Sequence, residues 1–335
     1  MKIAILDDYQ DAVRELDCFS LLDSHDVKVF NHSTRGLGQL VARLAPFDAL
    51  VLIRERTQLN RALLAKLPNL KLISQTGKVS GHIDVAAATE FGIAIAEGTG
   101  SPVAPAELTW ALIMAAQRKI VPYASHLKEG TWQTVSTSQP FNTLGTVLNG
   151  RTLAIWGYGK IGKLLAGYGK AFGMDVLVWG SADSRARATA DGCRAAESRA
   201  AFFEEADVLT LHLRLADATR GIVTADDLAR MKPTALFVNT SRAELVAEGA
   251  LEGALRSGRP GAAALDVFEN EPLPADSILL RMPHVLATPH LGYVEKDSYE
   301  LYFSHAFRNL VDFFDGQCGT ILNPDYRTNV RGVKS

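Results

Sequence analysis

Short apolar runs rich in β-branched residues alternate along the chain with longer segments whose apolar residues recur at helical spacing. In the first hundred residues the runs predict strands at 2–6, 27–30, 49–53 and 71–74, and the spacing predicts a helix over 11–22. The same rhythm begins again after Gly150 and predicts six more strands, at 152–156, 176–179, 208–211, 235–239, 262–266 and 285–288. Such alternation is typical of parallel sheets covered by helices. We therefore expect an α/β protein with two parallel-sheet domains.

Two longer helical patterns predict how these domains are connected. The first begins at Ser101-Pro102, with the serine as N-cap and the proline at the first helical position. The second covers 299–313 and has Gly316 as its stop. Since this last helix follows the second set of strands, we expect the chain to return to the first domain. The predicted domains are residues 1–101 plus 294–335, which are discontinuous, and residues 102–293.

Composition excludes several classes of protein. The chain has 335 residues, of which 47% are apolar and 21% charged, and its net charge is -2. A nucleic-acid-binding protein would carry a basic excess, so we expect no nucleic-acid partner. Cys18, Cys193 and Cys318 lie far apart without CxxC spacing, so we expect no metal site. No apolar run reaches the ~18 residues of a spanning helix or forms a signal-peptide core, so we expect a cytoplasmic protein without a membrane partner.

A glycine-rich turn follows the strand predicted at 152–156. It reads Gly157-Tyr158-Gly159-Lys160-Ile161-Gly162, and a helical pattern follows it. Between a strand and a helix, such glycines permit a tight turn, close approach of a pyrophosphate to the backbone, and close packing of the helix on the strand. The helix N-terminus adds free N–H groups and a partial positive charge. We therefore predict that these six residues bind a dinucleotide cofactor.

The choice between NAD and NADP depends on the residues after the next predicted strand. An acid at this place holds the adenosine ribose and repels a 2′-phosphate. This chain has Gly180 and Ser181 there instead, with Arg185 and Arg187 soon after. We therefore expect Gly180 and Ser181 to line the ribose, and NADPH to be accepted or slightly favoured. The alternative is that both arginines are solvated helix residues and that Asp183 or water serves NADH.

Three segments after later strands carry residues suited to acid–base chemistry. They contain Arg242, Glu271 and His290, and ligands of open α/β sheets bind beyond the carboxyl ends of the strands. Each residue alone is usually a surface or structural side chain. Their occurrence together in these three contexts points to a reaction site. The segments are 239–242, 266–272 and 288–292.

With these segments the chain resembles the NAD(P)-dependent D-2-hydroxyacid dehydrogenases, which include D-3-phosphoglycerate dehydrogenase and glyoxylate/hydroxypyruvate reductase. The resemblance covers nearly the whole chain. It implies two flavodoxin/Rossmann-like domains with a cleft between them, a homodimer, and hydride transfer between a nicotinamide cofactor and a D-2-hydroxy acid or 2-oxo acid. Besides the glycine loop and the three segments, the matching motifs are Leu211-His212, Met231-Lys232-Pro233, Gly261 to Phe268, and, in the first part of the chain, Gly77, Ile83-Asp84 and Ala106-Glu107.

The chemistry of 2-oxo acid reduction assigns roles to these residues. The carbonyl oxygen needs a proton, which an imidazolium can supply near neutral pH. We expect His290 to be this general acid–base, and Glu271 to favour its charged form and fix its ring. Arg242 suits the substrate carboxylate as a planar bidentate cation, and it polarises the carbonyl. By resemblance, Asp266 holds the nicotinamide carboxamide. The other positions expected along the cofactor are His212, for which a structural role is equally expected, Thr240 and Gly292.

A loop in the first domain departs from the family pattern. The family often has Gly-x-Gly before the Ile-Asp pair, whereas this chain has Gly77-Lys78-Val79. In the family, backbone N–H groups of this loop contact the substrate carboxylate. We therefore expect these three residues to bind substrate with the help of Arg54, and Lys78 to take a second anionic group. The alternative is that Lys78 is solvated.

Two further departures leave the substrate open. Glu97 stands where the family commonly has Asn, and Tyr293 stands where a small residue is common. The candidates are a 3-phosphoglycerate-like acid and a hydroxypyruvate- or glyoxylate-like acid. Other interpretations are a formate-type dehydrogenase, which pairs its His with Gln and is therefore disfavoured by Glu271, and a cofactor-sensing binding protein of the corepressor type.

Overall fold

The chain divides into two compact units. The first consists of Met1–Ser101 and Glu295–Ser335, and the second is Pro102–Val294. The computed structural model describes all residues except 35, 134–143, 318–319 and 330–335, so Cys318 lies outside the described residues. The prediction of an α/β protein with two parallel sheets is confirmed. Within the described part of the chain, no helix is long and apolar enough to cross a membrane.

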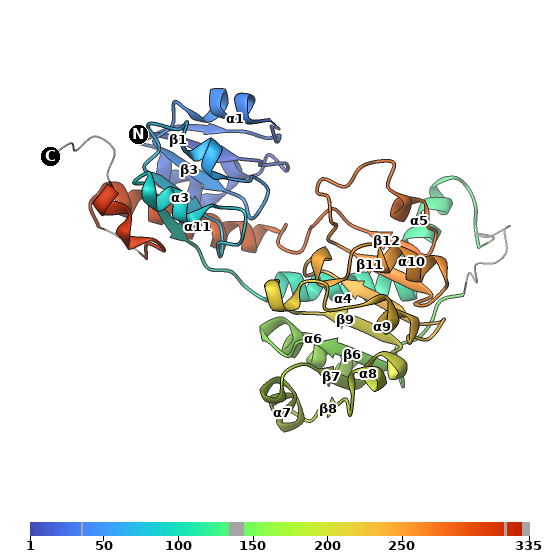
Figure 1. Cartoon of the computed structure of the whole chain (residues 1–335). Helices are drawn as coiled ribbons and strands as arrows, with labels where there is room; N and C mark the ends of the chain where they lie inside the picture. The colour runs from blue at the N-terminus through green and yellow to red at the C-terminus, as the bar shows by residue number, and fades with distance from the viewer. Residues whose placement is uncertain (35, 134–143, 318–319, 330–335) are drawn as a thin grey trace. The chain divides into compact units, whose positions relative to one another are not determined.

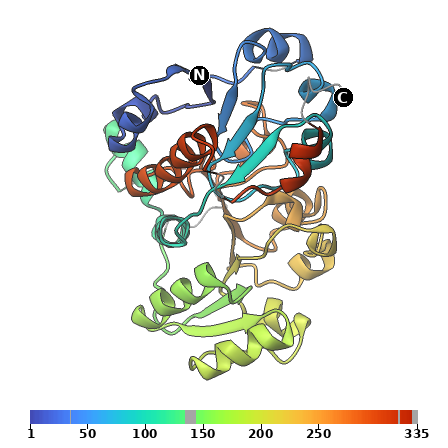
Figure 2. The same cartoon turned by 90° about the vertical axis from the view of Figure 1, so that its left-hand side faces the viewer.

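The first unit is a five-stranded parallel sheet with the flavodoxin-like order β2-β1-β3-β4-β5. One face packs against α1–α3 through an aliphatic cluster that includes Leu44, Leu63 and Ala87. The other face packs against α11 (Figure 2). There the Ser74 hydroxyl donates to the carbonyl of Ala306 at 2.8 Å. The strands are β1 Lys2–Leu6, β2 Asp26–Val29, β3 Ala49–Leu52, β4 Leu72–Gln75 and β5 Ala94–Glu97; the helices are α1 Leu37–Leu44, α2 Arg61–Leu64, α3 Val85–Glu90 and α11 Lys296–Phe314.

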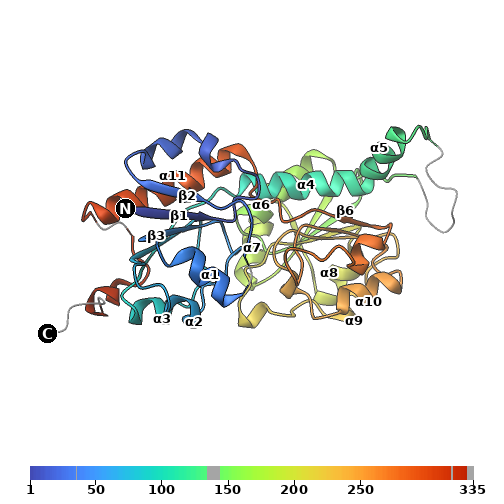
Figure 3. The same cartoon turned by 90° about the horizontal axis from the view of Figure 1, so that it is seen from above.

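The second unit is a seven-stranded parallel sheet in the order β12-β11-β10-β9-β6-β7-β8, which contains the Rossmann arrangement (Figure 1). Helices α4, α6 and α7 cover one face and α8–α10 the other (Figure 3). The strands are β6 Thr152–Trp156, β7 Asp175–Trp179, β8 Arg194–Ala195, β9 Val208–Leu211, β10 Leu236–Asn239, β11 Ala262–Leu265 and β12 Val285–Ala287; the helices are α4 Val103–Gln117, α5 Ile120–Lys128, α6 Lys160–Ala171, α7 Ala182–Ala190, α8 Arg199–Glu205, α9 Ala225–Ala229 and α10 Ala250–Arg256.

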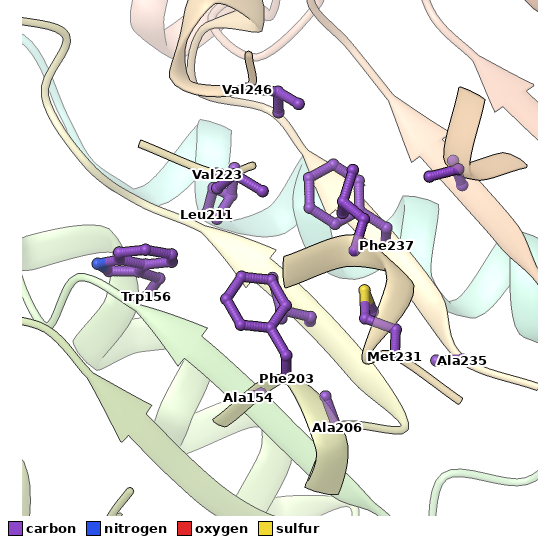
Figure 4. Packing of buried hydrophobic residues seen from close by; sticks show 14 of the residues in the cluster. Ala154, Trp156, Phe203, Ala206, Leu211, Val223, Met231, Ala235, Phe237 and Val246 are labelled. Carbon is purple, nitrogen blue, oxygen red and sulfur yellow. The ribbon is translucent and has the colours of Figure 1, made fainter. Parts of the chain in front are cut away.

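Aromatic side chains fill the core beneath α8. Trp156 of β6 meets Phe202 and Phe203 edge to face, with ring centroids 5.9 and 5.8 Å apart. Phe237 of β10 and Met231 continue the same cluster (Figure 4). Edge-to-face aromatic pairs add about 0.5–1.5 kcal/mol each to the burial of their surface. This packing fixes β6, and therefore the glycine loop that follows it.

The structure corrects three local predictions and confirms a fourth. No α-helix spans 11–22; two 3₁₀ helices, Val13–Glu15 and Asp17–Leu22, replace it, because Leu16 is extended between them. The predicted strands omitted β5 and β8. In α4, Pro102 itself is the N-cap and makes no side-chain cap bond, so Ser101 does not cap that helix. The C-terminal helix ends as expected, with Gly316 in the left-handed region just after it.

Candidate active site

The register of the second sheet brings the predicted cofactor residues to one edge. Strand ends Trp179, Trp156, Leu211, Asn239, Leu265 and Ala287 pair in one continuous row across the sheet. In a parallel sheet, the residues that follow such a row lie side by side beyond the carboxyl ends of the strands. These residues are Gly180, Gly157, His212, Thr240, Asp266 and Thr288.

An ion pair between His290 and Glu271 forms the centre of this edge. The Nδ1 atom of His290 lies 2.7 Å from Oε2 of Glu271, and Oε1 of Glu271 accepts the N–H of Phe268 at 3.0 Å. Burial acts to raise the pKa of Glu271, but the hydrogen bond and charge of His290 prevail and hold that pKa below its usual range. A carboxylate that stays ionised accepts from Nδ1–H, so Nε2 is the ring nitrogen left to exchange a proton.

Asp266 fixes the backbone that carries His290. Its Oδ1 accepts from the Thr288 hydroxyl and the Leu291 N–H, both at 2.7 Å, and its Oδ2 accepts from the Gly292 N–H at 2.9 Å. His290 itself has a left-handed backbone with φ 54°. Burial raises the pKa of Asp266 although these hydrogen bonds oppose it. Asp266 therefore holds the loop in the conformation that presents the imidazole, a role that the sequence did not reveal.

Tyr293 bounds the imidazole on another side. Its ring is buried and meets the His290 ring edge to face, with centroids 5.7 Å apart. Aromatic edges of this kind restrict rotation of the partner ring as well as stabilise it. Thus the residue that departs from the family pattern lies directly beside the proposed proton donor.

Arg242 extends from the loop after β10. Asn239 shapes this loop, since its amide donates to the Arg242 carbonyl at 2.9 Å and its Oδ1 accepts the Ser241 N–H at 3.0 Å. The guanidinium donates to the Ser241 carbonyl at 2.6 Å and is near enough to Glu271 to lower the pKa of that carboxyl. Thr240, next in the loop, shares a 2.7 Å hydrogen bond with Thr109 of α4. The structure therefore brings Arg242, Glu271 and His290 together.

The glycine loop fits a dinucleotide. A Cβ on Gly157, whose φ is 105°, would lie 2.5 Å from the His212 carbonyl oxygen, and one on Gly162 would lie 2.2 Å from the Gly157 oxygen. By contrast, a Cβ on Gly159 would meet no atom within 4 Å, and no side chain caps α6 there. Open space beside uncapped helix N–H groups is what a pyrophosphate requires.

Tyr158 connects this loop to α7 and to the residues that follow that helix. Its ring is buried, its hydroxyl donates to Asp191 at 3.0 Å, and its N–H donates to the Ser184 hydroxyl at 3.1 Å. Burial and the hydrogen bond to Asp191 raise the pKa of the phenol above its usual value. Tyr158 is thus held within the unit, whereas Lys160 and Ile161 begin α6.

The segment after β7 places two arginines differently. The Arg187 guanidinium donates to Asp183 at 2.5 Å and to the Tyr158 carbonyl at 3.3 Å. The Arg185 guanidinium lies 4.8 Å over the Trp179 ring, and its buried Nε has no hydrogen-bond partner among the described residues. Ser181 caps α7 by accepting the Ser184 N–H at 3.2 Å. The segment after β7 therefore presents the Arg185 guanidinium, and the Asp183 carboxylate is engaged by Arg187.

His212 is not suited to proton transfer. Burial lowers the pKa of this histidine to about 3, so the ring is neutral at physiological pH. Its Nε2 lies 2.9 Å from the Thr210 hydroxyl, and its carbonyl packs against Gly157. These contacts are structural, whereas His290 is paired with the Glu271 carboxylate.

The first unit also gathers its predicted residues at the carboxyl edge of its sheet. Arg54 has a left-handed backbone, φ 53°, held by the Thr76 hydroxyl, which accepts its N–H at 3.0 Å. A glycine is favoured at position 77, because its φ is 89°, and a Cβ there would lie 2.2 Å from the end of the flexible Arg54 side chain. Lys78 Nζ lies 3.0 Å from Glu97 Oε2, and the Val79 N–H donates to Glu97 Oε1 at 2.7 Å.

Comparison with known proteins identifies the family. Residues 110–292 match the model described as "D-isomer specific 2-hydroxyacid dehydrogenase, NAD binding domain". The chain is also 37% identical to the glyoxylate reductase of Aeropyrum pernix over 283 residues, which is 83% of each chain. The chain belongs to this family. It is therefore an oxidoreductase acting on CH–OH groups with a nicotinamide cofactor, as the sequence predicted.

Two other similarities bear on the substrate. The D-3-phosphoglycerate dehydrogenase of Methanocaldococcus jannaschii is 35% identical over 294 residues, covering 87% of this chain and 53% of that protein. The chain thus spans about half the length of that relative. A solved oxidoreductase structure from Ralstonia solanacearum is 60% identical with a TM-score of 0.95, covering 97% of this chain and 98% of that one. The two curated relatives described here are therefore named for different substrates, glyoxylate and 3-phosphoglycerate.

Proposed function

We propose that this 2-hydroxyacid dehydrogenase works as a reductase of small 2-oxo acids, with His290 as its proton donor. The 2.7 Å contact between His290 and the ionised Glu271 carries the proposal, because it leaves one ring nitrogen for proton exchange. The pairing with a glutamate also disfavours a formate-type reaction, which needs no proton donor.

Three residues of the second unit have separate roles in the proposed reaction. The reduced nicotinamide, when bound, supplies a hydride to the carbonyl carbon. Arg242 binds the substrate carboxylate and draws electron density toward the carbonyl oxygen. The His290 imidazolium donates its Nε2 proton to that oxygen as Glu271 steadies the ring through Nδ1. In the oxidative direction the neutral ring accepts the hydroxyl proton, so the same pair serves both directions.

We propose that the glycine loop holds the cofactor pyrophosphate and that NADPH is accepted beside NADH. Gly159 offers the open space, and Gly180 with Ser181 replaces the acid that would repel a 2′-phosphate. The buried Nε of Arg185, without a partner in the described part of the chain, supports an anion there. Asp266, Thr240 and Gly292 are proposed to line the nicotinamide end.

For the substrate we propose that the Gly77-Lys78-Val79 loop meets the substrate, with the Arg54 guanidinium of the first unit and the backbone of Gly77 and Lys78 recognising its carboxylate, since the Val79 N–H is engaged by Glu97. The closeness of the Arg54 guanidinium to Gly77 supports this, because it places a bidentate cation beside the loop at the carboxyl edge of a parallel sheet.

Cofactor oxidation tests the proposal directly. The purified protein would be given NADH or NADPH with glyoxylate, hydroxypyruvate, phosphohydroxypyruvate or a bulkier 2-oxo acid, and the absorbance of the reduced cofactor followed. Turnover of at least one acid is expected, and the ratio of the two cofactors' kcat/KM values decides their ranking. Absence of turnover with every acid, although both cofactors bind, would reject the reductase assignment.

A further inference from the structure

Glu97 introduces an unexpected charge at the carboxyl edge of the first sheet. Its two carboxylate oxygens are both engaged by the adjacent loop, one by the Lys78 ammonium at 3.0 Å and the other by the Val79 N–H at 2.7 Å. An ammonium and a backbone N–H are the groups that would otherwise receive an anionic ligand. The loop therefore already holds one carboxylate, and that carboxylate belongs to the chain.

The backbone keeps Glu97 in this place. Glu97 pairs in register with Gln75 across β4 and β5, and the following Gly98 N–H donates to the Gly77 carbonyl at 2.8 Å. A Cβ on Gly98 would lie only 2.7 Å from the Gly77 nitrogen, so the two turns lie against each other. The Glu97 side chain is 17% exposed, compared with 70% for Lys78. The carboxylate is thus a fixed part of the loop, whereas the lysine is held mainly by its charge.

Two other cations of this edge are also engaged by groups of the chain. Arg56 donates to the Asp7 carbonyl at 2.6 Å and stacks on Tyr9 with its guanidinium carbon 4.4 Å from the ring centroid. Arg54 lies 3.8 Å from Glu55. Lys78 and Arg54 therefore each face a carboxylate of the chain, that of Glu97 or that of Glu55. An edge with this balance suits one substrate carboxylate, and it disfavours an acid that carries a second anionic group.

We propose that Glu97 is a specificity-determining residue. By neutralising Lys78 and occupying the Val79 N–H, it makes the enzyme select 2-oxo acids with a single negative charge over those that also carry a phosphate or a second carboxylate. This inference rests on the proposed function, in which the loop meets the substrate, and it goes further by naming the charge class. It assigns Lys78 to the pair with Glu97, so Lys78 receives a second anionic group only when the Glu97 charge is removed.

Glu97→Gln is the central variant, because the amide oxygen still accepts the Val79 N–H while the negative charge is lost. Hydroxypyruvate and its 3-phosphate provide matched substrates with one carbon skeleton. We expect the wild-type enzyme to favour hydroxypyruvate. In E97Q the kcat/KM for the phosphorylated acid should rise about tenfold relative to hydroxypyruvate, mainly through KM, and the gain should shrink at high salt. K78M should shift the ratio the other way, and K78M/E97Q should return near the wild type.

Glu90→Gln is the matched control. Glu90 is also a salt-bridged carboxylate of the first unit, 2.8 Å from Arg61, so its loss changes the net charge equally without touching the loop. It should leave the substrate ratio unchanged. A wild type that favours the phosphorylated acid, or an unchanged ratio in E97Q, overturns the proposal.

Direct binding separates this inference from the proposed function. Calorimetry on the NADH-loaded protein would compare oxamate, a monoanion, with 2-phosphoglycolate, which carries both a carboxylate and a phosphate. If no acid turns over, the reductase assignment fails. The ratio of the two dissociation constants still tests whether Glu97 selects ligands by charge. A ratio that favours oxamate in the wild type and falls in E97Q supports the charge selection, and equal ratios in both proteins reject it.

Discussion

The imidazole of His290 is constrained by three different neighbours. Glu271 holds Nδ1, the Tyr293 ring meets the imidazole edge to face, and Asp266 accepts the N–H groups of the two residues that follow His290. Such fixed orientation matters because proton transfer requires the donor within hydrogen-bond distance of its acceptor. The proposed acid–base role therefore depends on this set of contacts and not on the histidine alone.

Removal of the ring or of its partner should have separable effects. His290→Ala should lower turnover at least ~10²-fold, since general acid–base catalysis contributes this much or more.

Glu271→Gln removes a negative charge that favours the protonated ring, so the reduction rate should fall about tenfold at neutral pH and its upper pH limb should move to lower pH. The pH profile of kcat/KM measures this shift. A Glu271→Gln profile that coincides with the wild type would show that the carboxylate does not act through His290.

Arg185 should decide part of the cofactor preference. Its guanidinium is stacked on Trp179, and loss of the charge in Arg185→Met retains much of the apolar stem that covers the ring. The KM for NADPH should rise about tenfold while that for NADH changes little, because only NADPH carries the 2′-phosphate. Arg187→Met is the control, as Arg187 already pairs with Asp183. Equal losses for both cofactors in Arg185→Met would assign the residue to stability.

At the scale of elements, two glycines in the turn from β6 to α6 have different roles. Gly162 allows close packing, and Gly159 leaves open the space proposed for the cofactor. Gly162→Ala forces a Cβ against the Gly157 oxygen and should lower the melting temperature. Gly159→Ala meets open space with an ordinary backbone φ of -89°, so the fold should keep its melting temperature within a few degrees. Its methyl group nevertheless enters the space proposed for the pyrophosphate, and the dissociation constant for NADH should rise at least about tenfold. Calorimetry of unfolding and of cofactor binding measures both. Unchanged cofactor affinity in Gly159→Ala would contradict the proposed phosphate site.

The elements also show where a sequence pattern is sufficient. Strands such as β6 and β9 were predicted to the residue because buried parallel strands are continuous apolar runs between polar breaks. The segment 11–22 has the apolar spacing of a helix, but Leu16 is extended and the Glu300 carboxylate accepts the N–H groups of Asp17 and Cys18. That contact joins residues almost three hundred positions apart, so local spacing cannot predict it.

At the scale of the whole molecule, the sequence indicated which residues could carry chemistry, but it did not indicate which residues contact one another. Arg242, Glu271 and His290 were found because each follows a strand whose end lies in the same row of the sheet. Glu97 was noted only as a departure from the family pattern. Its partners Lys78 and Val79 became apparent from the parallel pairing of β4 and β5, one of which the sequence had not predicted. Charge pairing across strands depends on register, which a single sequence does not display.

An exposed apolar surface on α5 supports the prediction of a homodimer. Ile120, Val121 and Leu127 of α5 and Trp132 beyond it are all about half exposed or more. Such concentration of large apolar side chains marks a protein interface. Sedimentation should therefore give about twice the chain mass of 36.3 kDa. Ile120→Glu with Val121→Glu should shift the protein to the monomer, because two buried charges would oppose association. Lys128→Glu, which adds negative charge on the same helix without removing an apolar side chain, should remain a dimer. A wild-type chain that sediments as a monomer at micromolar concentration would contradict the expectation, and a dimer that survives the double substitution would place the interface elsewhere.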